Sequence, residues 1–165
     1  MTRTRFLPWF LPLVLACAAP ADQDTSAAAV DTAAVMTAVT DFWPRYIAAD
    51  TSNDPVAIAG MFTEDGRVDA RGIPVLDGRA AIQSFLETAL KSMRYTSLAV
   101  MPDMTVPVSN ELVYQNGSYV ENMVVEGRPA TEHGRYAMAL RKDGDGQWRV
   151  MHLFAFADST IHARR

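Results

Sequence analysis

The sequence predicts an α+β fold in which three helices come first and an antiparallel sheet follows. Up to about residue 93, apolar residues recur at spacings of three and four, which is the period of a helix with one buried face. From Tyr95 onwards, β-branched and aromatic segments alternate with short runs of turn-forming residues, which is typical of strands joined by hairpins. Helices followed by strands, rather than alternating with them, indicate helices packed on one antiparallel sheet.

Residues 1–16 are expected to form a lipoprotein signal peptide. Arg3 and Arg5 precede an apolar stretch, Phe6–Leu15, that is shorter than the roughly 20 residues needed to cross a bilayer. The Val-Leu-Ala-Cys sequence ending at Cys17 resembles the lipobox of bacterial lipoproteins, in which the cysteine is lipidated and becomes the N-terminus. We therefore expect a membrane anchor on Cys17 and a location in the bacterial cell envelope, on its periplasmic or outer-surface side. The alternative is a chance cysteine after an ordinary secretory signal.

The remaining chain divides into a tether, one domain and a tail. Residues 18–30 lack large apolar groups in any burial pattern, so 17–30 are expected to be the lipidated cysteine and a flexible tether. The length of 165 residues suits one hydrophobic core, which we place in residues 31–160, with 161–165 as a tail. The formal net charge is −4 and no compact Lys/Arg cluster is present, so nucleic acid is not an expected partner.

The first two helices follow from apolar spacing and capping residues. Between Asp31 and Asp50, large apolar residues recur every three or four positions, and Pro44 inside this segment predicts a kink or a break. Asp54 followed by Pro55 predicts the start of a second, short helix.

A small hairpin and a third helix are expected next. Residues 67–76 are short and turn-rich, which suits a hairpin, and Asp77 is the predicted cap of the helix that follows. One stripe of this helix is apolar and must face a core; it comprises Ile82, Phe85, Leu86, Ala89, Leu90 and Met93.

The predicted strands cover most of the rest of the chain. Asn116-Gly117 is interpreted as a bulge within one long strand, in preference to a hairpin turn. Strands are expected at 96–101, 105–108, 111–125, 135–141 and 147–156, separated by Ser, Asn, Gly, Asp and Pro residues.

Three sequence stretches resemble the SnoaL-like domains of the nuclear-transport-factor-2-like superfamily. They are Phe62-Thr-Glu-Asp-Gly-Arg-Val-Asp69, Leu76-Asp-Gly-Arg-Ala-Ala-Ile82 and Gly144-Asp-Gly-Gln-Trp-Arg-Val150. The resemblance implies a cone, with three helices closing over a curved sheet in a cystatin-like roll. It carries little information about activity, because this superfamily contains enzymes of several kinds and many proteins without catalysis.

Comparison with ketosteroid isomerase, a member of the same superfamily, suggests a catalytic pair. Tyr46 and Asp69 fall where that enzyme has its oxyanion-donating tyrosine and its base aspartate. A carboxylate in an apolar cone would abstract a proton next to a carbonyl, with the phenol binding the enolate oxygen. The enzyme's third group, a protonated carboxylic acid, is missing, because that region reads Ala137-Met138-Ala139.

Alternation in the last strand leaves two interpretations for His152. Counted from Gly146 without a gap, Met151 and Leu153 face the cone and His152 faces outward; a bulge would instead turn His152 inward as a second acid or base. The residues expected to line a ligand site are Trp43, Phe85, Met138, Met151 and Leu153.

No cofactor or metal site is expected. The three histidines have no metal-ligand spacing, and the sequence has no Gly-rich phosphate loop and no Gly-x-Ser-x-Gly motif. Loss of the third catalytic position favours a non-catalytic domain that binds a small hydrophobic molecule or a protein, with a homodimer through the outer sheet face as one arrangement. The alternative is a cofactor-free isomerase, cyclase or dehydratase that uses Asp69 and Tyr46.

Overall fold

The structure is a computed structural model that describes residues 29–162. The expected signal peptide, Cys17 and most of the tether lie outside the described residues, as do residues 163–165. Within the described range, no helix combines the length and the apolar character that a bilayer span requires.

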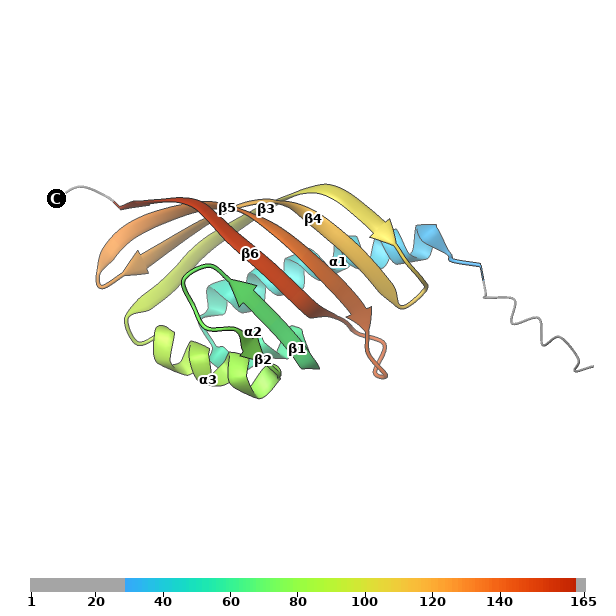
Figure 1. The fold of residues 1–165 in the computed structure, drawn as a ribbon, viewed down its shortest axis with the longest axis horizontal. Coiled ribbons are helices and arrows are strands. Elements are labelled where there is room, and N and C mark those ends of the chain that lie inside the picture. The colour runs from blue at the N-terminus through green and yellow to red at the C-terminus, as the bar shows by residue number, and fades with distance from the viewer. Residues whose placement is uncertain (1–28, 163–165) are drawn as a thin grey trace, which may run out of the picture.

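Three helices pack against one sheet of six strands, which confirms the predicted α+β class (Figure 1). The helices are α1 (Thr32–Ser52), α2 (Pro55–Gly60) and α3 (Arg79–Ala89). The strands are β1 (Phe62–Ala70), β2 (Leu76–Asp77), β3 (Met93–Pro107), β4 (Leu112–Val125), β5 (Arg128–Lys142) and β6 (Trp148–His162). The sheet is curved, and all three helices lie on its concave side.

The four long strands form the antiparallel meander that the sequence predicts. The order across the sheet is β2-β1-β6-β5-β4-β3. Neighbours from β3 to β6 are antiparallel, whereas β1 runs parallel to β6. The meander is built from longer strands than expected, because segments 96–101 and 105–108 belong to the single strand β3, and β6 continues to His162.

Helix α1 continues through Pro44 without a break. Asp31 caps its first turn by accepting a hydrogen bond from the Ala34 amide at 3.0 Å. Proline inside a helix costs about 3 kcal/mol, but α1 buries apolar side chains on both sides of Pro44, including Phe42 and Tyr46. The burial of this face outweighs the lost backbone hydrogen bond.

The prediction that Asp77 caps α3 is wrong. Gly78 is the cap residue, with a φ of 88° that favours glycine. Asp77 belongs to β2, where it lies opposite Arg67 and forms an ion pair with it at 3.6 Å. Helix α3 is anchored instead by Arg79, whose guanidinium donates two hydrogen bonds to the Phe62 carbonyl at 2.9 and 2.7 Å. Met93, predicted on the helix stripe, begins β3.

The bulge expected at Asn116-Gly117 lies on the facing strand. Strand β4 is continuous, as predicted, but the register slips between Pro102 and Met104 of β3. A Cβ at Gly117 would overlap the Met101 carbonyl. Glycine therefore allows the bulged strand to pass close to β4.

Candidate functional site

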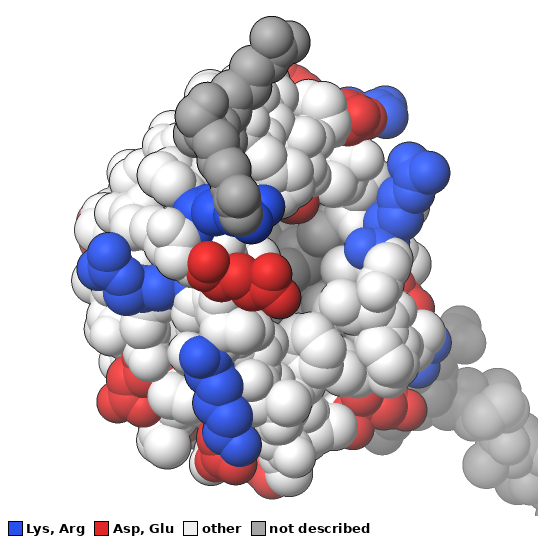
Figure 2. Space-filling view, turned by 90° about the vertical axis from the view of Figure 1, so that its left-hand side faces the viewer, with Lys and Arg blue, Asp and Glu red and all other residues white. Residues whose placement is uncertain are grey.

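An open cavity of about 320 Å³ lies between the helices and the concave face of the sheet. Most of its lining side chains are apolar or aromatic. Figure 2 shows that the end of the molecule on the left of Figure 1 is hollowed, with acidic side chains beside the hollow. The cone implied by the sequence is therefore not filled by its own side chains.

Most residues expected to face the cone do line this cavity. They are Trp43, Tyr46, Phe85, Met138 and Leu153. Trp43 and Tyr46 come from α1, Phe85 from α3, and the other two from β5 and β6. Their role in ligand binding stays a prediction.

A bulge in β6 decides which side chains of this strand face inward. The register slips at Met151, because Leu140 pairs with Val150 whereas Ala139 pairs with His152. Val150 and Leu153 consequently both line the cavity. Met151 and His152 do not line it. The predicted lining role of Met151 is therefore wrong, and so is the alternative in which a bulge turns His152 into the pocket.

Asp69 lies on the outer face of the sheet and is not brought together with Tyr46. Its neighbours in β1, Val68 and Ala70, line the cavity, which turns Asp69 to the opposite side. The Asp69 carboxylate contacts His152 Nε2 at 2.7 Å and Arg67 Nε at 2.9 Å. These hydrogen bonds, first that of His152 and then that of Arg67, lower the pKa of Asp69. The predicted catalytic pair does not form.

Asp50, near the end of α1, is the carboxylate that faces the cavity in place of Asp69. It stands one helical turn after Tyr46, and both side chains line the cavity. Only 6% of Asp50 is exposed, and burial raises its pKa to about 7. Its Oδ2 atom is buried without a hydrogen-bond partner among the described residues. This side chain can therefore exchange a proton near neutral pH.

Two glutamates from the sheet complete an acidic lining. Glu121 of β4 and Glu132 of β5 both face the cavity. Burial, followed by the charges of Asp50 and Glu132, raises the pKa of Glu121 to about 9. Glu132 accepts a hydrogen bond from the Tyr119 hydroxyl at 2.7 Å. At neutral pH, Glu121 is therefore mostly protonated and can donate a hydrogen bond to a ligand.

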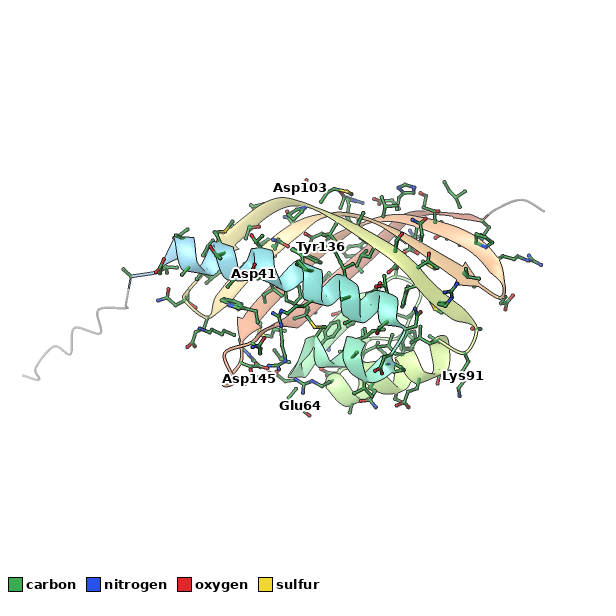
Figure 3. The ribbon with its side chains drawn as sticks, turned by 180° about the vertical axis from the view of Figure 1, so that it is seen from behind. Asp41, Glu64, Lys91, Asp103, Tyr136 and Asp145 are labelled. Carbon is green, nitrogen blue, oxygen red and sulfur yellow. The ribbon has the colours of Figure 1, made fainter. Side chains whose placement is uncertain are left out.

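The aromatic wall of the cavity is fixed by one buried amide. The Gln115 Oε1 atom accepts hydrogen bonds from Trp43 Nε1 and from the Tyr136 hydroxyl, each at 3.0 Å. The two rings meet edge to face with centroids 5.5 Å apart, and Figure 3 shows Tyr136 between the sheet and α1. Gln115 in turn donates to Thr105 Oγ1 at 2.7 Å. The wall is thus held in place before any ligand enters.

A second polar contact holds β3 against the end of α1. Asn53, in the left-handed conformation at the C-cap of α1, accepts a hydrogen bond from the Tyr95 amide at 2.7 Å and donates to the Tyr95 carbonyl at 2.9 Å. This paired contact positions Tyr95 beside Asp50 at the cavity wall.

The comparisons with known proteins decide the family. Residues 31–153 match the family described as the SnoaL-like domain. The chain belongs to this family. No curated protein sequence matches it.

Solved structures share the SnoaL-like fold at low sequence identity. A ketosteroid isomerase-like protein from Erwinia carotovora atroseptica SCRI1043 is 16% identical, with a TM-score of 0.66 over 74% of this chain and 95% of that chain. A candidate scytalone dehydratase from Novosphingobium aromaticivorans DSM 12444 is 19% identical, with a TM-score of 0.67 over 81% and 90%. A hexachlorocyclohexane dehydrochlorinase from Novosphingobium barchaimii LL02 is 12% identical, with a TM-score of 0.66 over 79% and 91%. These similarities show the fold alone.

The acidic lining of this SnoaL-like domain was not predicted from its sequence, although two signals point to it. Asp50 continues the four-residue spacing of Phe42 and Tyr46 along the buried face of α1. Glu121 lies at even spacing from Val113 and Met123 on the inner face of β4. In both cases an ionisable residue occupies a position where the helical spacing or the strand alternation predicts an apolar residue. In the range 29–162, no group of three or more His, Cys, Asp or Glu is arranged to hold a metal ion.

Proposed function

We propose that this SnoaL-like domain binds a small, mostly apolar organic molecule inside its cone. The observation that carries the proposal is the open cavity of about 320 Å³ with its apolar and aromatic lining. Ligand pockets of about 300 to 1,000 Å³ are typical of small-molecule sites, and the size here suits a molecule of one or two rings. Polar side chains on one part of the wall would orient such a ligand.

The test is uptake of a neutral apolar dye, 1-N-phenylnaphthylamine, followed by its fluorescence. Ala155 lines the cavity, so Ala155→Phe is expected to fill part of the space and to weaken dye binding by about tenfold or more. Ala137 pairs with Phe154 outside the cavity lining, and Ala137→Phe is the matched control that keeps dye binding. Equal dye binding by wild type and Ala155→Phe, with both proteins folded, would contradict the proposal.

A second candidate function is cofactor-free acid–base catalysis on a small carbonyl compound. It is favoured by one observation, namely that Asp50 lines the cavity with its pKa raised to about 7, because a general base is most effective when its pKa lies near the working pH. The Asp50 carboxylate would take the proton from the carbon next to a carbonyl. The electron pair of that C–H bond moves to the carbonyl oxygen, and the Tyr46 hydroxyl donates a hydrogen bond to the resulting enolate.

Deuterium exchange tests this chemistry without knowledge of the substrate. The bound enolate of 1-tetralone would regain a deuteron from the exchanged Asp50 carboxyl in D₂O, and NMR measures the label. Asp50→Asn is expected to lower protein-dependent exchange by about a hundredfold or more, whereas Asp69→Asn on the outer face should leave it unchanged. Unchanged exchange in Asp50→Asn would rule out this residue as the base.

A further inference from the structure

The cavity gathers acidic side chains from three separate elements without a matching buried cation. Asp50 comes from α1, Glu121 from β4 and Glu132 from β5, and all three line the cavity. Among the described lining residues, Arg71 is the sole Lys or Arg, and its side chain belongs to an exposed residue of the β1–β2 loop. The inner part of the site therefore has an excess of negative charge when its carboxyl groups ionise.

One atom of this lining lacks a partner. Asp50 is 6% exposed, and its Oδ2 atom makes no hydrogen bond to any described residue. A buried carboxylate oxygen without a partner is costly, because desolvation is not compensated. A hydrogen-bond donor or a positive charge on a ligand would supply the missing interaction.

The uncharged part of the wall also suits a cation. Trp43, Tyr46, Tyr95, Tyr119 and Tyr136 all line the cavity. The Trp43 ring meets the rings of Tyr46 and Tyr136 edge to face, with centroids 5.7 and 5.5 Å away. Aromatic rings next to carboxylates are the surroundings in which substituted ammonium groups are recognised, because the ring faces attract positive charge.

We propose that the ligand of this cone is a small apolar molecule carrying an ammonium group, bound with that group between the Asp50 and Glu121 carboxyls and the aromatic wall. This inference rests on the proposed function, to which it adds the chemical class of the ligand. Above the Asp50 pKa of about 7, an anionic ligand would be repelled by the Asp50 carboxylate. A neutral ligand would fill the apolar part of the cavity but leave Asp50 Oδ2 without a counter-charge.

Two probes of nearly the same shape test the inference by isothermal titration calorimetry. Phenyltrimethylammonium carries a positive charge that does not depend on pH, and tert-butylbenzene replaces its nitrogen with carbon. At pH 8, above the Asp50 pKa of about 7, the cation is expected to bind about tenfold more tightly than the neutral probe. Asp50→Asn should reduce this preference severalfold while leaving the affinity for tert-butylbenzene unchanged. Glu121→Gln, which replaces a carboxyl that is still mostly protonated at this pH, should change the preference less.

Asp69→Asn is the matched control, because this substitution removes a carboxylate outside the cavity lining. It should keep the preference for the cation. The inference is overturned if the neutral probe binds as tightly as the cation, or if Asp50→Asn does not change the preference. If the inference fails but 1-N-phenylnaphthylamine still binds, the proposed function stands. If neither the dye nor the two probes bind, the proposed function and the inference are both rejected.

Discussion

Asp50 is an ionisable side chain at a buried position of α1 that favours an apolar one. The buried face of α1 contains Val35, Val39 and Phe42 before it reaches this residue, and an apolar side chain there would pack at lower cost. A buried ionisable group with a perturbed pKa in a cavity is a candidate for function rather than for stability. The same holds for Glu121, whose pKa burial raises to about 9.

The raised pKa values predict that the domain loses stability as pH rises. In the window from about pH 4 to pH 9, folded Asp50 and Glu121 hold protons that the unfolded chain has released, so the free energy of unfolding falls with pH and levels off above the folded pKa values. The loss for Asp50 is at most about 4 kcal/mol, since its pKa rises from 3.8 to about 7 and each pKa unit corresponds to about 1.4 kcal/mol.

Urea denaturation at pH 5 and pH 9 measures this effect. Asp50→Asn is expected to raise stability at pH 9 relative to wild type and to change it little at pH 5, and Glu121→Gln should act in the same direction. A wild-type protein that is as stable at pH 9 as at pH 5 would show that these carboxyls are ionised freely in the folded state.

At the scale of elements, close packing between β4 and β5 sets the position of the cavity wall. Gly134 of β5 lies under the Tyr119 ring of β4, and a Cβ at this position would overlap that ring. The absence of a side chain at Gly134 therefore lets Tyr119 reach Glu132, to which its hydroxyl donates at 2.7 Å.

Gly134→Ala is expected to destabilise the domain by about 1 to 3 kcal/mol, because the added methyl forces Tyr119 to move. Thermal unfolding measures the loss, and Gly144→Ala, where a Cβ would meet nothing within 4 Å, is a control expected to be near neutral. Combining Gly134→Ala with Tyr119→Ser should recover part of the stability. If Gly134→Ala has the same melting temperature as wild type, Tyr119 is not held against this glycine.

At the scale of the whole molecule, the domain has two different surfaces. The concave face surrounds the cavity, while the outer face carries exposed apolar side chains, among them Met104, Tyr114, Phe154 and Phe156. A homodimer through this outer face stays a prediction. The lipid anchor on Cys17, which lies outside the described residues, also stays a prediction.

The anchor is tested by expression of the full chain in a bacterial host with labelled fatty acid. We expect wild type to incorporate the label and to sediment with membranes, because an acylated N-terminal cysteine gives stable attachment. Cys17→Ala should lose the label and appear in the soluble fraction. If wild type is processed and exported without the label, the N-terminal segment is an ordinary secretory signal.

The sequence alone determined the fold class, because local patterns report which face of each element is buried. Helical spacing identified α1 and α3, and β-branched segments between turns identified the meander, so Trp43, Tyr46 and Phe85 could be expected at the cavity. Only the tertiary structure decided which polar groups face inward. The bulge at Met151 lets Val150 and Leu153 both face the cone, and alternation in β1 turns Asp69 to the outer face, where it pairs with His152. A shift of one residue in a strand reverses every side chain that follows, and no local pattern fixes such shifts, because they depend on pairing between strands that are distant in the sequence.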